Sequence, residues 1–237
     1  MVMQRFTDRM QAGKLLAERL EAYANRPDAL VLALPRGGVP VGFALAEALN
    51  LPLDILLVRK LGVPGHEEVA MGAIASGGGR IIRHDIVKML GITDEAIEET
   101  TRRERAEMQR RDLLYRAGQP PPRVEGREIL LVDDGLATGA TMMAAVQALR
   151  TRRPARVVVA VPVGAADACR LLSDEADEVV CLRMPEPFHA VSPWYDEFPQ
   201  TGDREVIDLL ERAYGFPRAG NAAATAGRPD AQARRGR

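Results

Sequence analysis

The sequence predicts an α/β fold, in which one five-stranded parallel sheet has helices on both faces. Five short apolar segments have the length and composition of buried strands: residues 29–34, 53–58, 128–132, 156–161 and 178–182. Helical patterns separate most of these segments, and strands that alternate with helices are typical of a parallel sheet. The chain has 237 residues, of which 46% are hydrophobic and 27% charged, which is sufficient for one substantial globular domain.

The elements follow one another in a regular order. A first helix is expected to begin after Thr7 or Asp8, either of which suits an N-cap, and to end near residue 24. The helices that alternate with the five strands are predicted over residues 41–49, 141–150 and 165–172. In the strand order 2-1-3-4-5 the first and third strands are neighbours, so a ligand is expected at their carboxyl ends.

A long insertion, residues 60–127, separates the second strand from the third. Two short apolar segments on either side of Gly77-Gly78-Gly79 predict a hairpin, at residues 71–75 and 80–83. Residues 93–117 predict a charged helix, stabilised by pairs four residues apart: Glu98–Arg102, Glu99–Arg103 and Glu107–Arg111. Because acids alternate with the arginines, a solvated or subunit-packing helix is favoured over a nucleic-acid-binding face, which is the alternative.

Composition restricts the classes of function. The formal net charge of −1 gives no general reason to expect nucleic-acid or membrane binding. The two cysteines, Cys169 and Cys181, lack metal-binding spacing and are expected to be reduced thiols. The N-terminus lacks the apolar core of a signal sequence and no apolar run is long enough to span a membrane, so a cytoplasmic protein is expected. The domain is expected to span residues 1–216, followed by a disordered tail, residues 217–237.

The most informative segment is residues 129–141, which read ILLVDDGLATGAT. Four apolar residues predict a strand buried on both faces, and two carboxylates, Asp133 and Asp134, follow where that strand ends. A loop of small residues then leads into a helix, whose N-terminal N–H groups favour an anion. The carboxylates would repel a phosphate, so they are expected to face neutral hydroxyls or a cation. A sugar phosphate satisfies both parts of the segment.

This segment resembles the phosphoribosyl pyrophosphate signature of type I phosphoribosyltransferases, in which four apolar residues, two acids, two variable residues, a small residue, Thr and Gly recur in this order. The resemblance implies that Asp133 and Asp134 are catalytic residues that hold the ribose hydroxyls and meet Mg²⁺ only through the ligand or water. It assigns the 5′-phosphate to Gly135, Ala137, Thr138, Gly139, Ala140 and Thr141. An ordinary strand–turn–helix with acids capping the helix is the alternative.

A second loop follows the first strand, at Arg36-Gly37-Gly38. The two glycines leave the backbone unobstructed, and the arginine can pair with phosphate oxygens. In type I phosphoribosyltransferases the loop at this place binds pyrophosphate, and members that use xanthine and guanine have an arginine followed by two glycines here. The structural alternative is a tight turn.

The resemblance also implies a flap that closes over the leaving pyrophosphate, at residues 59–68. Arg59 and Lys60 suit charge stabilisation there and are assigned as catalytic residues, while the glycines and Pro64 suit a lid. The segment departs from the basic flap motif of members that use orotate. His66 is a candidate to protonate or orient a group in the closed site, although a lone histidine in a loop is more often only solvated.

The segment after the fifth strand resembles, more loosely, the place where purine phosphoribosyltransferases stack the base. Phe188 is assigned as the stacking residue and Asp196 as the acid near pyrophosphate and magnesium, with one residue inserted to align the acid. Aromatic residues clustered in this way also fill hydrophobic cores, which is the alternative.

The resemblance covers residues 6–210 and implies the type I phosphoribosyltransferase fold with a flap hairpin and a helical arm. The implied reaction transfers ribose 5-phosphate from phosphoribosyl pyrophosphate to a nitrogen acceptor, with a 6-oxopurine as the first candidate, and requires Mg²⁺. The expected partners are this substrate, a small-molecule acceptor and a second copy of the chain in a homodimer, with no membrane or nucleic acid. A regulatory protein that only binds phosphoribosyl pyrophosphate, or a transferase with a non-nucleobase acceptor, is the alternative.

Overall fold

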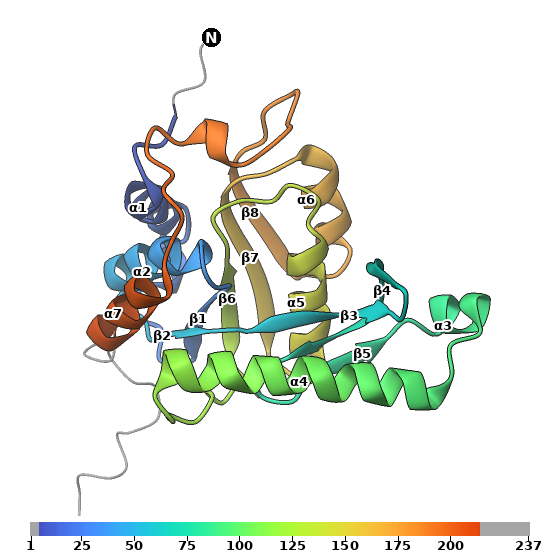
Figure 1. Cartoon of the computed structure of the whole chain (residues 1–237). Helices are drawn as coiled ribbons and strands as arrows, with labels where there is room; N and C mark the ends of the chain where they lie inside the picture. Colours follow the sequence, from blue (N-terminus) through green and yellow to red (C-terminus); the bar gives the residue numbers. More distant parts are fainter. Residues whose placement is uncertain (1–4, 214–237) are drawn as a thin grey trace, which may run out of the picture.

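The central element is a five-stranded parallel sheet, which confirms the predicted fold class (Figure 1). The computed structural model describes residues 5–213, except for the side chain of Glu68. The strands are β1 (Ala29–Ala33), β2 (Leu53–Ile55), β6 (Glu128–Val132), β7 (Arg156–Val163) and β8 (Glu178–Arg183). Their order is β2-β1-β6-β7-β8, which is the predicted order 2-1-3-4-5. The predicted disordered tail, residues 217–237, lies outside the described residues.

Alternate residues of the strands supply two separate cores, one on each face of the sheet. On one face Val31, Leu130 and Val158 pack with α1 (Arg9–Arg19), α2 (Gly38–Leu49) and α7 (Asp203–Ala213). On the other face Leu30, Ile129 and Val157 pack with α5 (Ala140–Arg150) and α6 (Ala166–Ser173). Burial on both faces explains why the strands are continuous apolar runs rather than alternating ones. Two short 3₁₀ turns complete this part, η1 (Glu21–Tyr23) and η2 (Ser192–Trp194).

The insertion forms a second, antiparallel sheet, in the order β3-β4-β5. Its strands are β3 (Val58–Val63), β4 (His66–Ala75) and β5 (Arg80–Ile82), so the predicted hairpin around Gly77-Gly78-Gly79 is present. The predicted second strand, residues 53–58, is interrupted at Leu57, whose N–H donates to Ser76 Oγ at 3.1 Å. The Ser76 N–H donates in turn to the Leu57 carbonyl at 2.8 Å. The chain therefore leaves the parallel sheet at residue 56 and pairs with β4 instead.

Two helices follow this sheet, α3 (His84–Leu90) and the 23-residue α4 (Asp94–Arg116). Thr93 caps α4, whose length runs along β3 in Figure 1. The predicted Glu107–Arg111 pair is present at 2.9 Å, whereas Glu98 pairs with Arg80 at 2.7 Å. Within residues 5–213, no helix is long and apolar enough to cross a membrane.

A buried arginine fixes the C-terminal end of α4. Arg116 is 1% exposed and forms ion pairs with Asp54 at 2.9 Å and with Asp112 at 2.7 Å. It also donates to the Ile55 carbonyl at 2.5 Å. Burial raises the pKa of Asp54 while the Arg116 charge opposes the rise. The insertion is therefore joined to the parallel sheet by a charged network rather than by apolar packing alone.

Candidate active site

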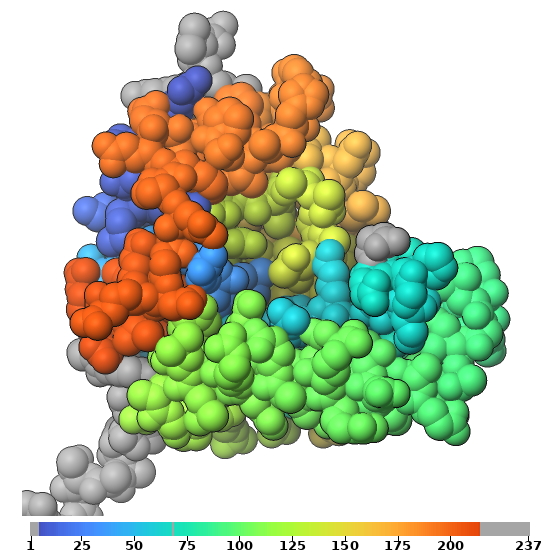
Figure 2. Space-filling view, viewed as in Figure 1, coloured from blue at the N-terminus to red at the C-terminus, as the bar shows by residue number. Residues whose placement is uncertain are grey.

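The Arg36 loop and the acid pair with its loop meet at the carboxyl ends of β1 and β6, which are neighbouring strands. The loop after β1 and the loop after β6 lie side by side, because the Leu34 N–H donates to the Val132 carbonyl at 2.9 Å. Figure 2 shows a hollow at this place, between the orange C-terminal segment and the green helix α4. Blue and yellow-green residues of the two loops lie at its floor. This arrangement is the crevice that the strand order predicts.

The two acids of the signature are held in different ways. The Asp134 N–H donates to Asp133 Oδ1 at 2.9 Å, whereas the Asp134 carboxylate is paired with Arg9. Arg9 Nε and Nη2 each lie 2.9 Å from Asp134 Oδ2. Burial raises the pKa of both carboxyls, the neighbouring Asp134 charge raises that of Asp133 further, and Arg9 opposes the rise at Asp134. The pair therefore forms an acidic site with one of its charges compensated.

The two glycines after β1 allow their loop to approach these acids closely. A Cβ atom on Gly37 would lie only 2.0 Å from Asp134 Oδ2, and one on Gly38 would lie 2.8 Å from the Val132 carbonyl oxygen. Gly37 has an ordinary helical φ of −61°. Close packing, rather than backbone conformation, therefore requires glycine at residue 37. The peptide bond between Pro35 and Arg36 is cis.

The loop after β6 leaves the N-terminus of α5 open. Gly139 precedes this helix with a φ of +72°, a conformation that favours glycine. Leu136 pairs with Gly164 after β7, which holds the first part of the loop. The remaining loop residues present an exposed surface, made by Ala137, Thr138, Ala140 and Thr141. Exposed hydroxyls and a helix N-terminus whose N-cap, Gly139, has no side chain suit an anionic group, although the Ala140 N–H donates to Thr138 Oγ1 at 3.4 Å.

Arg36 lies at the other side of the crevice, where it contacts helix α7. Its Nη1 atom is 3.6 Å from Asp203 Oδ1, and 38% of its side chain is exposed. The Tyr115 hydroxyl donates to the same Asp203 oxygen at 2.6 Å. This hydrogen bond and Arg36 lower the pKa of Asp203, while burial and Asp203 raise the pKa of Tyr115 to about 12. Arg36 is therefore available to a ligand once it leaves this carboxylate.

The structure brings Arg59 and Lys60 into the same region as the phosphate loop. Both lie on β3, and a cavity of about 330 Å³ is lined by these two residues, Arg103 and Thr141 among others. Arg59 Nε and Nη2 lie 2.9 and 2.6 Å from Glu104 Oε2 on α4. The guanidinium of Arg59 is thus neutralised by a neighbouring helix. His66 is exposed at the start of β4.

The segment after β8 covers the acid pair. Phe188 is half-buried and packs against the cluster of Phe6, Ala12, Val163 and Tyr195. The Tyr195 hydroxyl donates to the Asp134 carbonyl at 2.6 Å. Asp196 is exposed, and its N–H donates to the Phe6 carbonyl at 2.8 Å. Base stacking by Phe188 remains a prediction.

Sequence reasoning missed Arg9 and Tyr195, which contact Asp134 from 125 and 61 residues away. The position of Arg9 in the sequence does indicate a partner. It occupies the first position of a helix, where the helix dipole disfavours a cation. A cation at that position needs a compensating acid from elsewhere in the chain.

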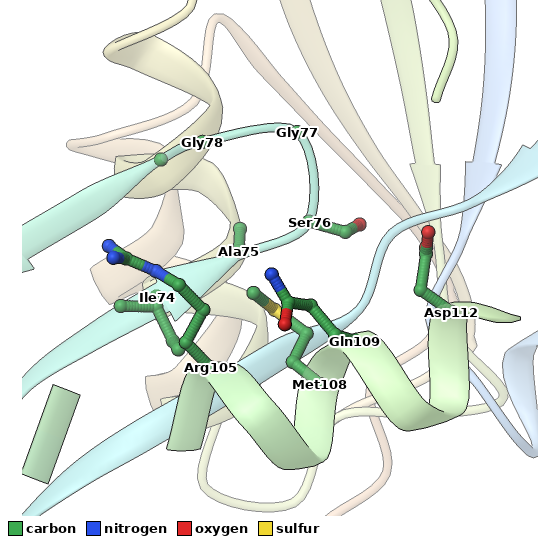
Figure 3. Close-up of a pocket in the computed structure, with 10 residues that line it drawn as sticks. Ile74, Ala75, Ser76, Gly77, Gly78, Arg105, Met108, Gln109 and Asp112 are labelled. Atoms are coloured by element: carbon green, nitrogen blue, oxygen red, sulfur yellow. The ribbon is translucent and has the colours of Figure 1, made fainter. Parts of the chain in front are cut away.

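A second cavity, of about 230 Å³, lies between α4 and the turn that joins β4 to β5 (Figure 3). Arg105 and Gln109 of α4 lie opposite the turn, and Asp112 lies on the side of Ser76. Gly77 and Gly78 have φ angles of +82° and +106°, a conformation that favours glycine, and a Cβ atom on Gly79 would lie 2.7 Å from the Ala148 carbonyl oxygen. Backbone conformation and close packing therefore explain why this turn contains three glycines.

The carboxylate oxygens of the acid pair would fit a magnesium ion whose other ligands are water and phosphate oxygens. Asp133 and Asp134 offer carboxylate oxygens, but one oxygen of Asp134 is already engaged by Arg9. Across residues 5–213, no group of three or more His, Cys, Asp or Glu side chains is arranged to hold a metal ion. Carboxylate oxygens are ligands that Mg²⁺ takes together with water and phosphate oxygens.

Comparisons with known proteins agree with this geometry. A family model described as a phosphoribosyl transferase domain matches residues 8–197. Two curated Mycobacterium tuberculosis proteins, from strains CDC 1551 / Oshkosh and ATCC 25618 / H37Rv, are 44% identical over 228 residues, or 96% of this chain, and are named "Putative phosphoribosyl transferase". The chain spans about half of their length, 51%. The crystal structure of TT1426 from Thermus thermophilus is 40% identical, with a TM-score of 0.79 and coverage of 88% of this chain and 99% of that one.

Proposed function

Because this chain belongs to the phosphoribosyl transferase domain family, we propose that it transfers ribose 5-phosphate from phosphoribosyl pyrophosphate to a nitrogen acceptor. The transfer releases pyrophosphate. The observation that carries the proposal is the acid pair at the end of β6 beside an open helix N-terminus. Asp133 and Asp134 match the ribose-binding acids of the family motif, and residues 137–141 match its phosphate loop.

Each side chain has a role in this reaction. The acids accept hydrogen bonds from the ribose hydroxyls and orient the sugar, while Thr138, Thr141 and the loop N–H groups hold the 5′-phosphate. Because the bond between the sugar carbon and pyrophosphate breaks with positive charge on the sugar, carboxylates nearby stabilise the transition state. Bound Mg²⁺ supplies charge neutralisation on the phosphates.

The leaving group would be met by cations on the other walls of the crevice. Arg36 is 3.6 Å from Asp203, and Arg59 is paired with Glu104, so each exchanges a carboxylate partner for a diphosphate oxygen. Gly37 and Gly38 let the diphosphate approach the backbone between these walls. Lys60, which is exposed on β3, adds a third cation at the flap.

We propose a 6-oxopurine as the first acceptor to test. Arg36-Gly37-Gly38 matches the pattern of members that use xanthine and guanine. Phe188 adds a half-buried aromatic ring in the segment that covers the acid pair. The proposed setting is a homodimer in the cytoplasm. The second candidate function is binding of phosphoribosyl pyrophosphate without transfer, which the same acid pair and open helix N-terminus would support.

The test is calorimetry with phosphoribosyl pyrophosphate and MgCl₂, followed by detection of released pyrophosphate with a panel of bases. The wild-type protein is expected to bind the ligand and to gain thermal stability from it. The double variant Asp133→Asn, Asp134→Asn is expected to lose about tenfold or more in affinity, because each charge-assisted hydrogen bond contributes about 1.5–3 kcal/mol.

Asp208→Asn is the matched control, because Asp208 is an exposed carboxylate paired with Arg204 on α7. No binding by the wild-type protein at millimolar ligand would refute the proposed function. Binding without pyrophosphate release from any base would refute a nucleobase acceptor and leave the second candidate or a different acceptor.

A further inference from the structure

Arg9 uses its whole guanidinium group to join three parts of the active site. Its residue is 8% exposed, and Nε and Nη2 contact Asp134 Oδ2 at 2.9 Å. Its third nitrogen, Nη1, donates to the Pro199 carbonyl at 2.8 Å. The plane of the group lies over the Phe198 ring, with 3.6 Å from Cζ to the ring centroid. One side chain of α1 thus links an acid of the signature to the C-terminal segment.

Asp134 is held on several sides by these contacts. Its Oδ2 atom lies 2.9 Å from Arg9 Nε and 2.0 Å from the position that a Cβ on Gly37 would occupy. Tyr195 fixes its carbonyl oxygen at 2.6 Å. Across the described part of the chain, its other carboxylate oxygen, Oδ1, receives no hydrogen bond from another side chain. Arg9 therefore occupies one oxygen and leaves the other for a ligand.

This geometry matters because the two acids are adjacent. Two buried carboxylates repel each other, and an unpaired one would turn towards water or take up a proton. An arginine that contacts one oxygen through two nitrogens favours the charged form of the carboxylate and holds that oxygen in place. A displacement of about 1 Å of a catalytic group can cost about 100-fold in rate.

We propose that Arg9 is the positioning residue of Asp134, the acid that accepts a ribose hydroxyl through Oδ1. The same side chain fixes this acid relative to the Phe198–Pro199 part of the cover. This inference rests on the proposed function, because it assigns Asp134 to the ribose. It adds a role that the signature does not contain, since Arg9 is remote from the signature in the sequence.

The experiment compares three ligands in the presence of MgCl₂: phosphoribosyl pyrophosphate, ribose 5-phosphate and pyrophosphate. Arg9→Met is expected to weaken the two ribose-containing ligands by about tenfold or more and to change pyrophosphate affinity by less than about twofold. Arg9→Lys keeps the charge and is expected to recover part of the loss. The double variant Arg9→Met, Asp134→Asn is expected to lose little more than Asp134→Asn alone, because both changes act on one carboxylate.

Arg26→Met is the matched control, since Arg26 also pairs with carboxylates, at Asp28 and Glu128, but outside the site. Equal losses for all three ligands, or unchanged ribose affinity, would overturn the inference. If Arg9→Met does not fold, the same comparison is made with Arg9→Lys, which must show the ribose-selective loss. If the wild-type protein binds no ribose-containing ligand, the proposed function itself fails, and the inference fails with it.

Discussion

Replacing Gly37 by alanine tests whether the loop after β1 and the acid pair form one site. The added Cβ atom would lie 2.0 Å from Asp134 Oδ2, whereas real Cβ atoms essentially never approach closer than 3.0 Å, so about 1 Å of movement is required. The carboxylate cannot simply swing away, because Arg9 holds Oδ2 at 2.9 Å. The backbone itself accepts alanine, since φ is −61° and ψ is −33°. The whole effect therefore comes from the collision.

The expected stability cost is that of an overpacked site, about 1–3 kcal/mol, measured by urea unfolding. The expected loss of phosphoribosyl pyrophosphate affinity, measured by calorimetry, is about tenfold or more, because one ribose-binding acid is displaced by about 1 Å. Gly202→Ala is the control, since its Cβ would meet nothing within 4 Å. Unchanged affinity in a folded Gly37→Ala variant would refute the close contact between loop and acid.

Four further changes have distinct expected outcomes. Arg36→Ala is expected to weaken pyrophosphate binding about tenfold or more while ribose 5-phosphate changes little, and equal losses in calorimetry would contradict a diphosphate role. Glu104→Gln frees Arg59 and is expected to tighten phosphoribosyl pyrophosphate binding about two- to fivefold, whereas weaker binding would count against this ion pair as a competitor. Phe188→Ala is expected to cost about 1–3 kcal/mol in purine binding, judged from base stacking, and loss of phosphoribosyl pyrophosphate affinity instead would oppose it. Arg116→Met leaves the half-buried carboxylates of Asp54 and Asp112 without this partner and is expected to lower the free energy of unfolding by about 1.5–3 kcal/mol, while a change below about 1 kcal/mol in urea unfolding would contradict the network.

The parallel sheet and the acid pair were predictable because their signals are local. A strand buried on both faces is a continuous apolar run, and residues 128–132 form β6 as predicted. The acids and the phosphate loop follow that strand directly, so the sequence alone places them at its carboxyl end. The strand order then brings the Arg36 loop next to them, as the fold class requires.

Contacts between distant segments could not be predicted in this way. The apolar run at residues 53–58 is divided between two sheets, because Leu57 pairs with Ser76, which lies 19 residues further along the chain. The carboxylate partners of Arg36 and Arg59 lie on helices whose placement the sequence pattern does not specify. Arg9 is the clearest case, since its partner Asp134 is separated from it by 125 residues.

Helix α4 contacts or carries the carboxylates that pair with Arg36 and Arg59, the two arginines beside the crevice. Glu104 belongs to α4 and neutralises Arg59, while Tyr115 of α4 holds Asp203, which faces Arg36. A rotation of α4 about its end at Arg116 would move Glu104 away from Arg59 and open that ion pair, whereas Asp203 belongs to α7 and would stay beside Arg36. Ligand affinity and helix orientation are then thermodynamically linked, so anything that locks α4 in its present orientation competes with a bound diphosphate.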